Sequence, residues 1–325
     1  MENPHLTASW APFVAFAVAV SVTYFLRSRW AASFAPDHPN ERSLHSRPVP
    51  RTGGIGAILG ILSASLVTPE FSFLLWFIIP LALISLLDDF KGLPAATRLA
   101  VHLAAAVAFS LIWTGLPFPW WIMVAFAIVW MVNLYNFMDG ADGLAGGMAV
   151  IGFGTYGAAA WIQGDLVLAQ VAWCVAAAAA GFLIFNFSPA SIFLGDVGSI
   201  PLGFLAGALG ALGVVRDVWS WWFPLVVFAP FVVDATTTLL HRVLRRQKVW
   251  QAHKDHYYQR LVRMGWSHQR TALAEYGLMA VCAAGAMSGF FLDASGRIAV
   301  LAFVAVIMAA SMRMVDAKWA KAAMK

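Results

Sequence analysis

Long apolar runs alternate with short polar stretches along the whole chain. A helix needs roughly 17–25 mostly apolar residues to cross the hydrocarbon core of a bilayer. The pattern predicts an all-α, polytopic membrane protein of about 11 transmembrane helices in a single transmembrane catalytic domain, residues 1–325, without linker or repeat. The expected spans are 9–27, 53–69, 71–87, 97–115, 118–136, 145–162, 168–187, 199–215, 219–240, 271–291 and 296–313.

Composition supports a membrane protein. Hydrophobic residues make up 61% of the 325 residues and charged residues 11%, whereas about 25% of the residues in a soluble globular protein are charged. We therefore expect the lipid bilayer as partner, and no nucleic acid. Cys174 and Cys282 fall inside apolar runs, so we expect them to pack between helices rather than form a disulfide or a metal pair.

The distribution of positive charge predicts the topology. No Lys or Arg precedes the first run, while Arg27 and Arg29 follow it, so this run is expected to be a retained helix with its N-terminus outside. Nineteen of the 21 Lys and Arg residues then fall on the cytoplasmic side, as the positive-inside rule requires. The expected cytoplasmic segments are 27–52, 88–98, 137–144, 188–198, 241–270 and the C-terminal tail.

Five unusual polar motifs fall on this one predicted face. Because chance would scatter such motifs over both faces, their placement predicts a shared cytoplasmic site. The motifs are PRTGG at 50–54, LDDFKGLP at 87–94, NLYNFMDGADGLAGG at 133–147, FNFSPASIFLGDVGS at 185–199 and HKDHYYQRL at 253–261.

Asp88 and Asp89 end an apolar helix, where the negative end of the helix dipole disfavours carboxylates. A cation is therefore expected beside them. One alternative is an interfacial ion pair with Lys91. The other is a divalent cation, because Mg²⁺ binds one or two carboxylates together with substrate phosphates.

The motif at 133–147 places Asn133, Asn136, Asp139 and Asp142 three residues apart, so each would neighbour the next on a helix. Its glycines would admit a ligand close to the backbone. The alternative is a capped turn between two helices, but a cap requires only one such residue.

Asp196 lies between glycines at the start of an apolar helix, whose free N–H groups could hold a phosphate. A simple N-cap is the alternative. His253 and His256 lie three residues apart in a basic loop beside two tyrosines. No Cys or second close His pair accompanies them, so we interpret them as phosphate- or substrate-binding residues rather than zinc ligands. Most charges of that loop are expected only to fix topology and meet anionic lipid.

In motif order, nearly the whole chain resembles the polyprenyl-phosphate N-acetylhexosamine-1-phosphate transferases. That family includes the phospho-N-acetylmuramoyl-pentapeptide transferase of peptidoglycan synthesis and enzymes that initiate O-antigen. The resemblance rests on PRTGG, LDDF, NLYNFMDGADGLA, FLGDVGS and the His-containing loop. It implies that a UDP-N-acetylhexosamine reacts with undecaprenyl phosphate at the bacterial inner membrane to give undecaprenyl-diphospho-sugar and UMP.

The resemblance also implies roles for residues. Asp88, Asp89 and Asp196 would form the catalytic centre and hold Mg²⁺ or Mn²⁺, with Asp196 the foremost ligand. Phe193 would lie against the uracil, and the two histidines of the loop would contact the sugar or diphosphate. The residues expected to bind substrate are Arg51, Asn133, Asn136, Asp139, Asp142, Asn186, Phe193, His253 and His256. We favour direct attack by the lipid phosphate over a phospho-enzyme, with Asp88 as the base if one is used.

Two departures bear on the substrate. Lys91 follows Asp89 by two residues rather than three, and the loop reads His253-Lys254-Asp255-His256 instead of three consecutive histidines. These features resemble the O-antigen-initiating branch and favour a small N-acetylated sugar over a muramoyl-pentapeptide, which remains the alternative. A transporter or flippase is the alternative from another class, with Asp234 as its intramembrane carboxylate. The sequence leaves the oligomeric state undetermined, and a homodimer is one of the alternatives.

Overall fold

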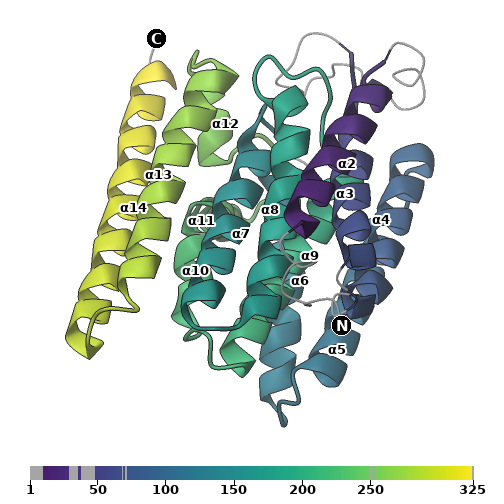
Figure 1. The fold of residues 1–325 in the computed structure, drawn as a ribbon. Coiled ribbons are helices and arrows are strands. Elements are labelled where there is room, and N and C mark those ends of the chain that lie inside the picture. The colour runs from purple at the N-terminus through teal and green to yellow at the C-terminus, as the bar shows by residue number, and fades with distance from the viewer. Residues whose placement is uncertain are drawn as a thin grey trace, which may run out of the picture.

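The computed structural model is a bundle of helices, most of which run side by side (Figure 1). It describes residues 10–28, 36–37, 48–67, 69, 72–248, 251 and 253–323. The helices are α2 (Ala11–Leu26), α3 (Gly53–Val67), α4 (Ser72–Lys91), α5 (Ala95–Trp113), α6 (Trp120–Phe137), α7 (Leu144–Ile162), α8 (Leu166–Asn186), α9 (Asp196–Val215), α10 (Trp222–Val227), α11 (Ala229–Leu244), α12 (Tyr257–Arg263), α13 (His268–Ser288) and α14 (Ala294–Ala323). Strands β1 (Pro36–Asp37) and β2 (Val49–Pro50) form one short antiparallel pair.

The predicted polytopic helical architecture is confirmed. Eight helices in the described part of the chain are long and apolar enough to cross a membrane, and α2 and α3 are shorter apolar helices. Of the eight, α9 is the most buried, and it packs against α4 and α6. Phe204 of α9 stacks on Phe77 of α4 with ring centroids 5.5 Å apart. The centre of the bundle is therefore built around α9, whose first residue is Asp196.

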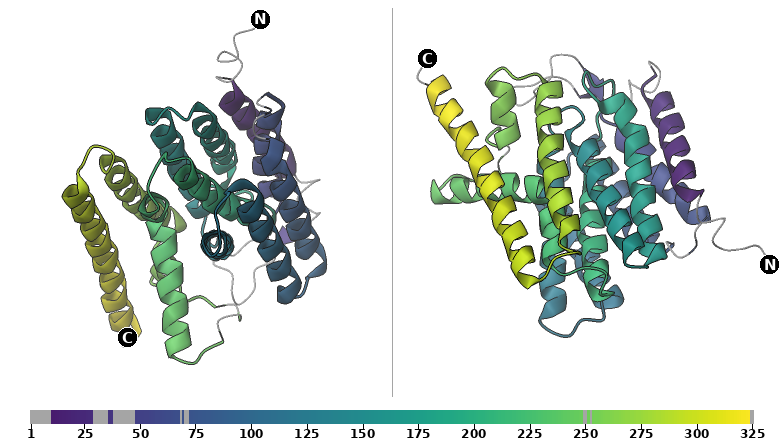
Figure 2. Two further views of the ribbon diagram at one scale, coloured as in Figure 1. Left: turned by 90° about the horizontal axis from the view of Figure 1, so that it is seen from below. Right: turned by 60° about the vertical axis from the view of Figure 1, so that its left-hand side comes forward.

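The prediction of a single helix over 219–240 is wrong. The structure has two helices there, α10 and α11, separated by Phe228. Pro230 lies in the first turn of α11, and because proline has no N–H and clashes with the preceding turn, α10 cannot continue through it. Figure 2 shows that α11 (light green) turns away and runs across the axis of the bundle.

Glycines bring the starts of α3 and α9 into backbone contact. A Cβ on Gly54 would collide with the backbone of Gly198, and one on Gly198 would meet the Cα of Gly54 at 2.8 Å. Gly195, just before α9, has φ +69, and a Cβ there would strike the carbonyl oxygen of Arg51. These contacts bring two of the polar motifs, PRTGG and FLGDVGS, to the same place.

Candidate active site

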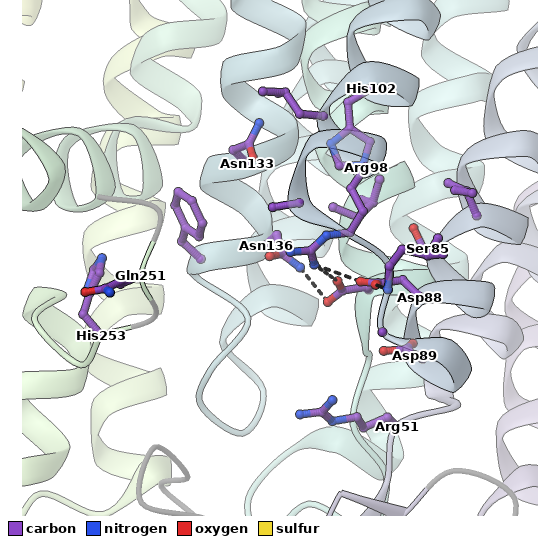
Figure 3. Close-up of a pocket in the computed structure, with 18 of the residues that line it drawn as sticks. Arg51, Ser85, Asp88, Asp89, Arg98, His102, Asn133, Asn136, Gln251 and His253 are labelled. Atoms are coloured by element: carbon purple, nitrogen blue, oxygen red, sulfur yellow. Dashed lines mark hydrogen bonds and ion pairs between the residues drawn. The ribbon is translucent and has the colours of Figure 1, made fainter. Parts of the chain in front are cut away.

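The predicted polar motifs meet around one cavity of about 860 Å³, at the end of the bundle where α12 lies (Figures 1 and 3). Its walls come from α4, α5, α6, α9 and the segment before α12. The predicted site residues that line it are Arg51, Asp88, Asp89, Asn133, Asn136, Asp196, His253 and His256. Residues far apart in sequence are thus brought to a single site.

At the centre of this cavity, two carboxylates converge on one cation. Asp88 Oδ2 lies 2.8 Å from Arg98 Nη1 (Figure 3). Asp196 Oδ2 lies 3.6 Å from the same nitrogen. Asp88 Oδ1 accepts a hydrogen bond of 2.6 Å from the backbone N–H of Leu93. Both oxygens of Asp88 are therefore engaged within the turn between α4 and α5.

Asn136 fixes the other carboxylate. Its side-chain amide donates to Asp196 Oδ1 at 2.8 Å and to Ser199 Oγ at 3.0 Å. Asn136 lies in the last turn of α6, so this bond joins the ends of α6 and α9 beside the cavity. The amide thus sets the orientation of Asp196.

The backbone of the PRTGG motif supports the loop before α9. Gly53 N donates to Phe193 O at 2.9 Å, Gly54 N to Leu194 O at 2.8 Å, and Phe193 N to Pro50 O at 2.8 Å. These three bonds hold Asp196 at its place by holding the residues that precede it. Phe193 itself does not line the cavity.

Asn186 and Asp142 bind neighbouring loops rather than lining the cavity. Asn186 accepts from Gly143 N at 3.0 Å and donates to Ile192 O at 2.9 Å. Asp142 accepts from Ala190 N at 3.1 Å and lies 3.0 Å from Nδ1 of His268. Burial opposes ionisation of Asp142, but the hydrogen bonds from His268 and Ala190 outweigh it and lower its pKa.

Asp139 does not line the cavity either, although it is close enough to Asp196 and Asp89 to interact with their charges. Burial, followed by the nearby charge of Asp196, raises the pKa of Asp139 well above its ordinary value. Arg51 and a backbone hydrogen bond from Gly195 act in the opposite direction. Asp139 is thus electrostatically coupled to the carboxylates that line the cavity.

Two residues that the sequence did not single out also line the cavity. Arg98, in the first turn of α5, forms the ion pair with Asp88 that one alternative expected from Lys91. Lys91 is exposed. His102, one turn further along α5, is only 6% exposed, and its Nδ1 has no hydrogen-bond partner among the described residues. Figure 3 shows both side chains on the same wall. A substrate phosphate could occupy this wall, since both side chains offer N–H donors.

The residues at the centre fit a divalent cation. The oxygens of Asp88 and Asp196 come from different helices and already share one cationic nitrogen. Within the described part of the chain, no three His, Cys, Asp or Glu side chains are arranged to hold a metal by themselves. Such a donor set suits Mg²⁺, which takes one or two carboxylates and completes its shell with water and substrate phosphates.

His253 and His256 lie next to each other on the opposite wall, with ring centroids 4.9 Å apart. Burial, followed by the neighbouring His256 and Arg242, lowers the pKa of His253 to about 4. At neutral pH the His253 ring is therefore uncharged.

This lowered pKa predicts a pH-dependent stability. In the unfolded chain a histidine titrates near pH 6.5, so between pH 6.5 and about 4 the unfolded state binds more protons than the folded state. The free energy of unfolding should fall as the pH falls through this window. Replacing His253 by Asn should reduce the loss of thermal stability between pH 7 and pH 4.5 by about 2 °C or more. If the melting temperatures of the parent protein and of His253→Asn depended on pH in the same way, the lowered pKa of His253 would be contradicted.

Comparisons with known proteins identify the family of the chain. The family model described as glycosyl transferase family 4 matches residues 71–214. A probable undecaprenyl-phosphate N-acetylglucosaminyl 1-phosphate transferase of Bacillus subtilis is 31% identical, over 74% of each chain. A decaprenyl-phosphate N-acetylglucosaminephosphotransferase of Mycolicibacterium smegmatis is also 31% identical, over 90% of this chain and 85% of the relative.

A phospho-N-acetylmuramoyl-pentapeptide-transferase of Bacillus pumilus is 27% identical, over 78% of this chain and 87% of the relative. The family predicted from the order of the motifs is therefore confirmed. The chain belongs to glycosyl transferase family 4.

Proposed function

We propose that this membrane enzyme transfers N-acetylhexosamine 1-phosphate from a UDP-sugar to undecaprenyl phosphate and releases UMP. The observation that carries the proposal is the convergence of Asp88 and Asp196 on Arg98 inside the cavity. This arrangement suits a reaction between two phosphate groups. Two relatives that are 31% identical are named for N-acetylglucosamine phosphate transfer to a prenyl phosphate, which supports the same chemistry here.

Phosphoryl transfer depends mainly on positioning and on charge stabilisation. The lipid phosphate has a second pKa near 6, so at neutral pH it is largely a dianion and a competent nucleophile. It attacks the β-phosphorus of the UDP-sugar, a new P–O bond forms, and the bond from that phosphorus to the oxygen shared with the α-phosphate breaks. The departing electron pair stays on UMP.

The residues of the cavity divide this work. Arg98 binds phosphate oxygens and neutralises charge that would otherwise keep the two substrates apart. Asp88 and Asp196 would hold Mg²⁺, and the bound ion would supply further charge neutralisation. Both oxygens of Asp88 accept hydrogen bonds, so neither is free to act as a nucleophile, which supports direct attack by the lipid rather than a phospho-enzyme.

The nucleotide is assigned to the neighbourhood of the loops after α6 and α8. Although neither residue lines the cavity, we assign Asp139 and Phe193 to the nucleotide as the family resemblance implies, with Phe193 against the uracil. Asp142 and Asn186 are assigned a supporting role, because their hydrogen bonds join the two loops. The nucleotide would then bind beside the motifs at 133–147 and 185–199.

The site is proposed to face the cytoplasm of a bacterial inner membrane, with the N-terminus outside and eleven crossings if α10 and α11 together make one. Reporters placed at Gly92, Gly140, Ile192 and Asp255 should all report the cytoplasmic side, and one at Arg216 the outside. His45, another expected cytoplasmic position, lies outside the described residues. An external signal from any of the first four would exclude this orientation.

A donor comparison tests the function and the substrate. The purified protein should release UMP from UDP-N-acetylglucosamine or a UDP-6-deoxy-N-acetylhexosamine only when undecaprenyl phosphate is added. We expect little release from UDP-muramoyl-pentapeptide, because the loop has Lys254 and Asp255 where the peptidoglycan branch has histidines, and lost polar contacts can change discrimination by several powers of ten. Such a preference would also support a place in O-antigen or related glycan synthesis. Equal or faster release from the pentapeptide donor would overturn the choice of branch.

A further inference from the structure

Asp234 is a buried carboxylate outside the acidic centre, and the proposed reaction has not used it. It lies in α11, the helix that runs across the bundle, and is 5% exposed. Its oxygens contact four groups: the backbone N–H of Tyr257 at 3.0 Å, the backbone N–H of Tyr258 at 3.1 Å, Thr238 Oγ1 at 3.2 Å and His256 Nδ1 at 3.2 Å. A single side chain thus holds both the start of α12 and the ring of His256.

The ring of His256 is fixed from other sides as well. It stacks on Phe137 with centroids 5.9 Å apart and on Tyr258 with centroids 6.0 Å apart. The backbone N–H of His256 donates to Gln259 Oε1 at 3.3 Å. Although His256 is 2% exposed, it lines the cavity. The two stacked rings and Asp234 thus hold the His256 ring at the wall of the cavity.

The contact with Asp234 selects a tautomer. An ionised carboxylate only accepts hydrogen bonds, so a hydrogen bond between Asp234 and the ring requires the hydrogen on Nδ1 of His256. In the neutral imidazole, Nε2 is then the remaining nitrogen and a hydrogen-bond acceptor. An acceptor at this wall suits a hydroxyl or amide N–H of a sugar better than it suits a phosphate, which at neutral pH also accepts.

We propose that Asp234 is a positioning residue, which holds His256 in the Nδ1–H tautomer so that Nε2 accepts a hydrogen bond from the N-acetylhexosamine of the donor. The role in turnover rests on the proposed function, whereas the tautomer does not. Asp234 also caps α12, so the two contributions have to be separated by experiment.

Asp234→Asn acts on the two contributions unequally. Tyr257 and Tyr258 donate to different oxygens of Asp234, Oδ1 and Oδ2, and the ring of His256 lies at Oδ1. With the amide oxygen in the place of Oδ2 the bond from Tyr258 is kept, whereas the bond from Tyr257 is lost, a loss of capping that the control variant below matches. The amide N–H group would now face the ring and favour the opposite tautomer, with the hydrogen on Nε2. Loss of the correct tautomer should lower kcat/KM for the UDP-sugar by about 10²-fold at pH 8. His256→Gln should lower it by a similar factor, and the double variant should be no worse than His256→Gln alone.

Asp316→Asn is the matched control. Asp316 also ties down α12, but through Arg260 Nη1 at 2.8 Å and the Tyr257 hydroxyl at 3.3 Å rather than through His256. Its variant should stay within about 3-fold of the parent protein. The positioning role would be overturned if the double variant lost kcat/KM by the product of the two single losses. It would also be overturned if kcat/KM of Asp234→Asn stayed within about 3-fold of the parent protein.

Long-range ¹H–¹⁵N spectra of the histidine rings decide the tautomer without any turnover, with His256→Gln identifying the signal. We expect Nδ1–H in the parent protein and Nε2–H in Asp234→Asn. An Nε2–H tautomer in the parent protein would overturn the inference. If the parent protein releases no UMP from any UDP-sugar, the proposed function fails while these spectra still decide the assignment of Asp234.

Discussion

Asp196→Asn is expected to lower kcat by at least about 10²-fold in a protein that still folds and inserts into the membrane. Asn preserves the size of the side chain and the bond from Asn136, but it removes the negative charge that faces Arg98. Divalent cations bind carboxylates through that charge, so the variant should also require more Mg²⁺ for half-maximal rate. Asp88→Asn and Asp89→Asn are expected to be similarly impaired.

Asp165→Asn provides the matched control. Asp165 likewise pairs with an arginine, Arg216, at 3.2 Å and lies at the start of a helix, but at the opposite end of the bundle. Asn also serves as an N-cap, so this variant should keep near-normal rates. Turnover and Mg²⁺ dependence should be measured for both variants. Normal values for Asp196→Asn would show that the metal assignment is wrong.

Arg98→Gln is expected to cause a loss of about 10²-fold in kcat/KM for undecaprenyl phosphate. The change removes a cation that Asp88 and Asp196 share, so less positive charge would face the incoming phosphate. Arg98→Lys should recover part of the activity, because it restores the charge but not the planar pair of donors.

Lys91→Gln is the control for Arg98, since it removes an exposed cation from the end of α4, seven residues earlier. It should change the rate less than about 3-fold, as surface substitutions usually have small effects. Rates measured over a range of lipid concentrations would distinguish the two. If Arg98→Gln and Lys91→Gln both changed kcat/KM only slightly, Arg98 would not be a phosphate-binding residue.

The acidic centre could be predicted because carboxylates are conspicuous in an apolar chain. Asp88, Asp89 and Asp196 stand out in the sequence, and the charge pattern assigned them to one face. Arg98 could not be recognised in the same way, since a single arginine between two spans is equally typical of a topology signal. Its role depends on a turn that folds it back onto Asp88.

Other features required three-dimensional information. Asn186 and Asp142 are polar residues in the right segments, but which loops they bind depends on how α6, α8 and α13 pack. The break between α10 and α11 was missed because apolar content continues through Pro230, and hydropathy does not register a missing N–H. That break sets α11 across the bundle and brings Asp234 to His256.

The most direct test of sugar-phosphate transfer follows the β-phosphate of the donor. UDP-N-acetylglucosamine carrying ³²P in its β-phosphate should be incubated with the purified protein, Mg²⁺ and undecaprenyl phosphate. Transfer of N-acetylhexosamine 1-phosphate predicts that the label moves into the lipid fraction in equal amount to the UMP released, and that Asp196→Asn abolishes both. Label retained in UDP, with only the sugar moved to an acceptor, would contradict the proposed reaction.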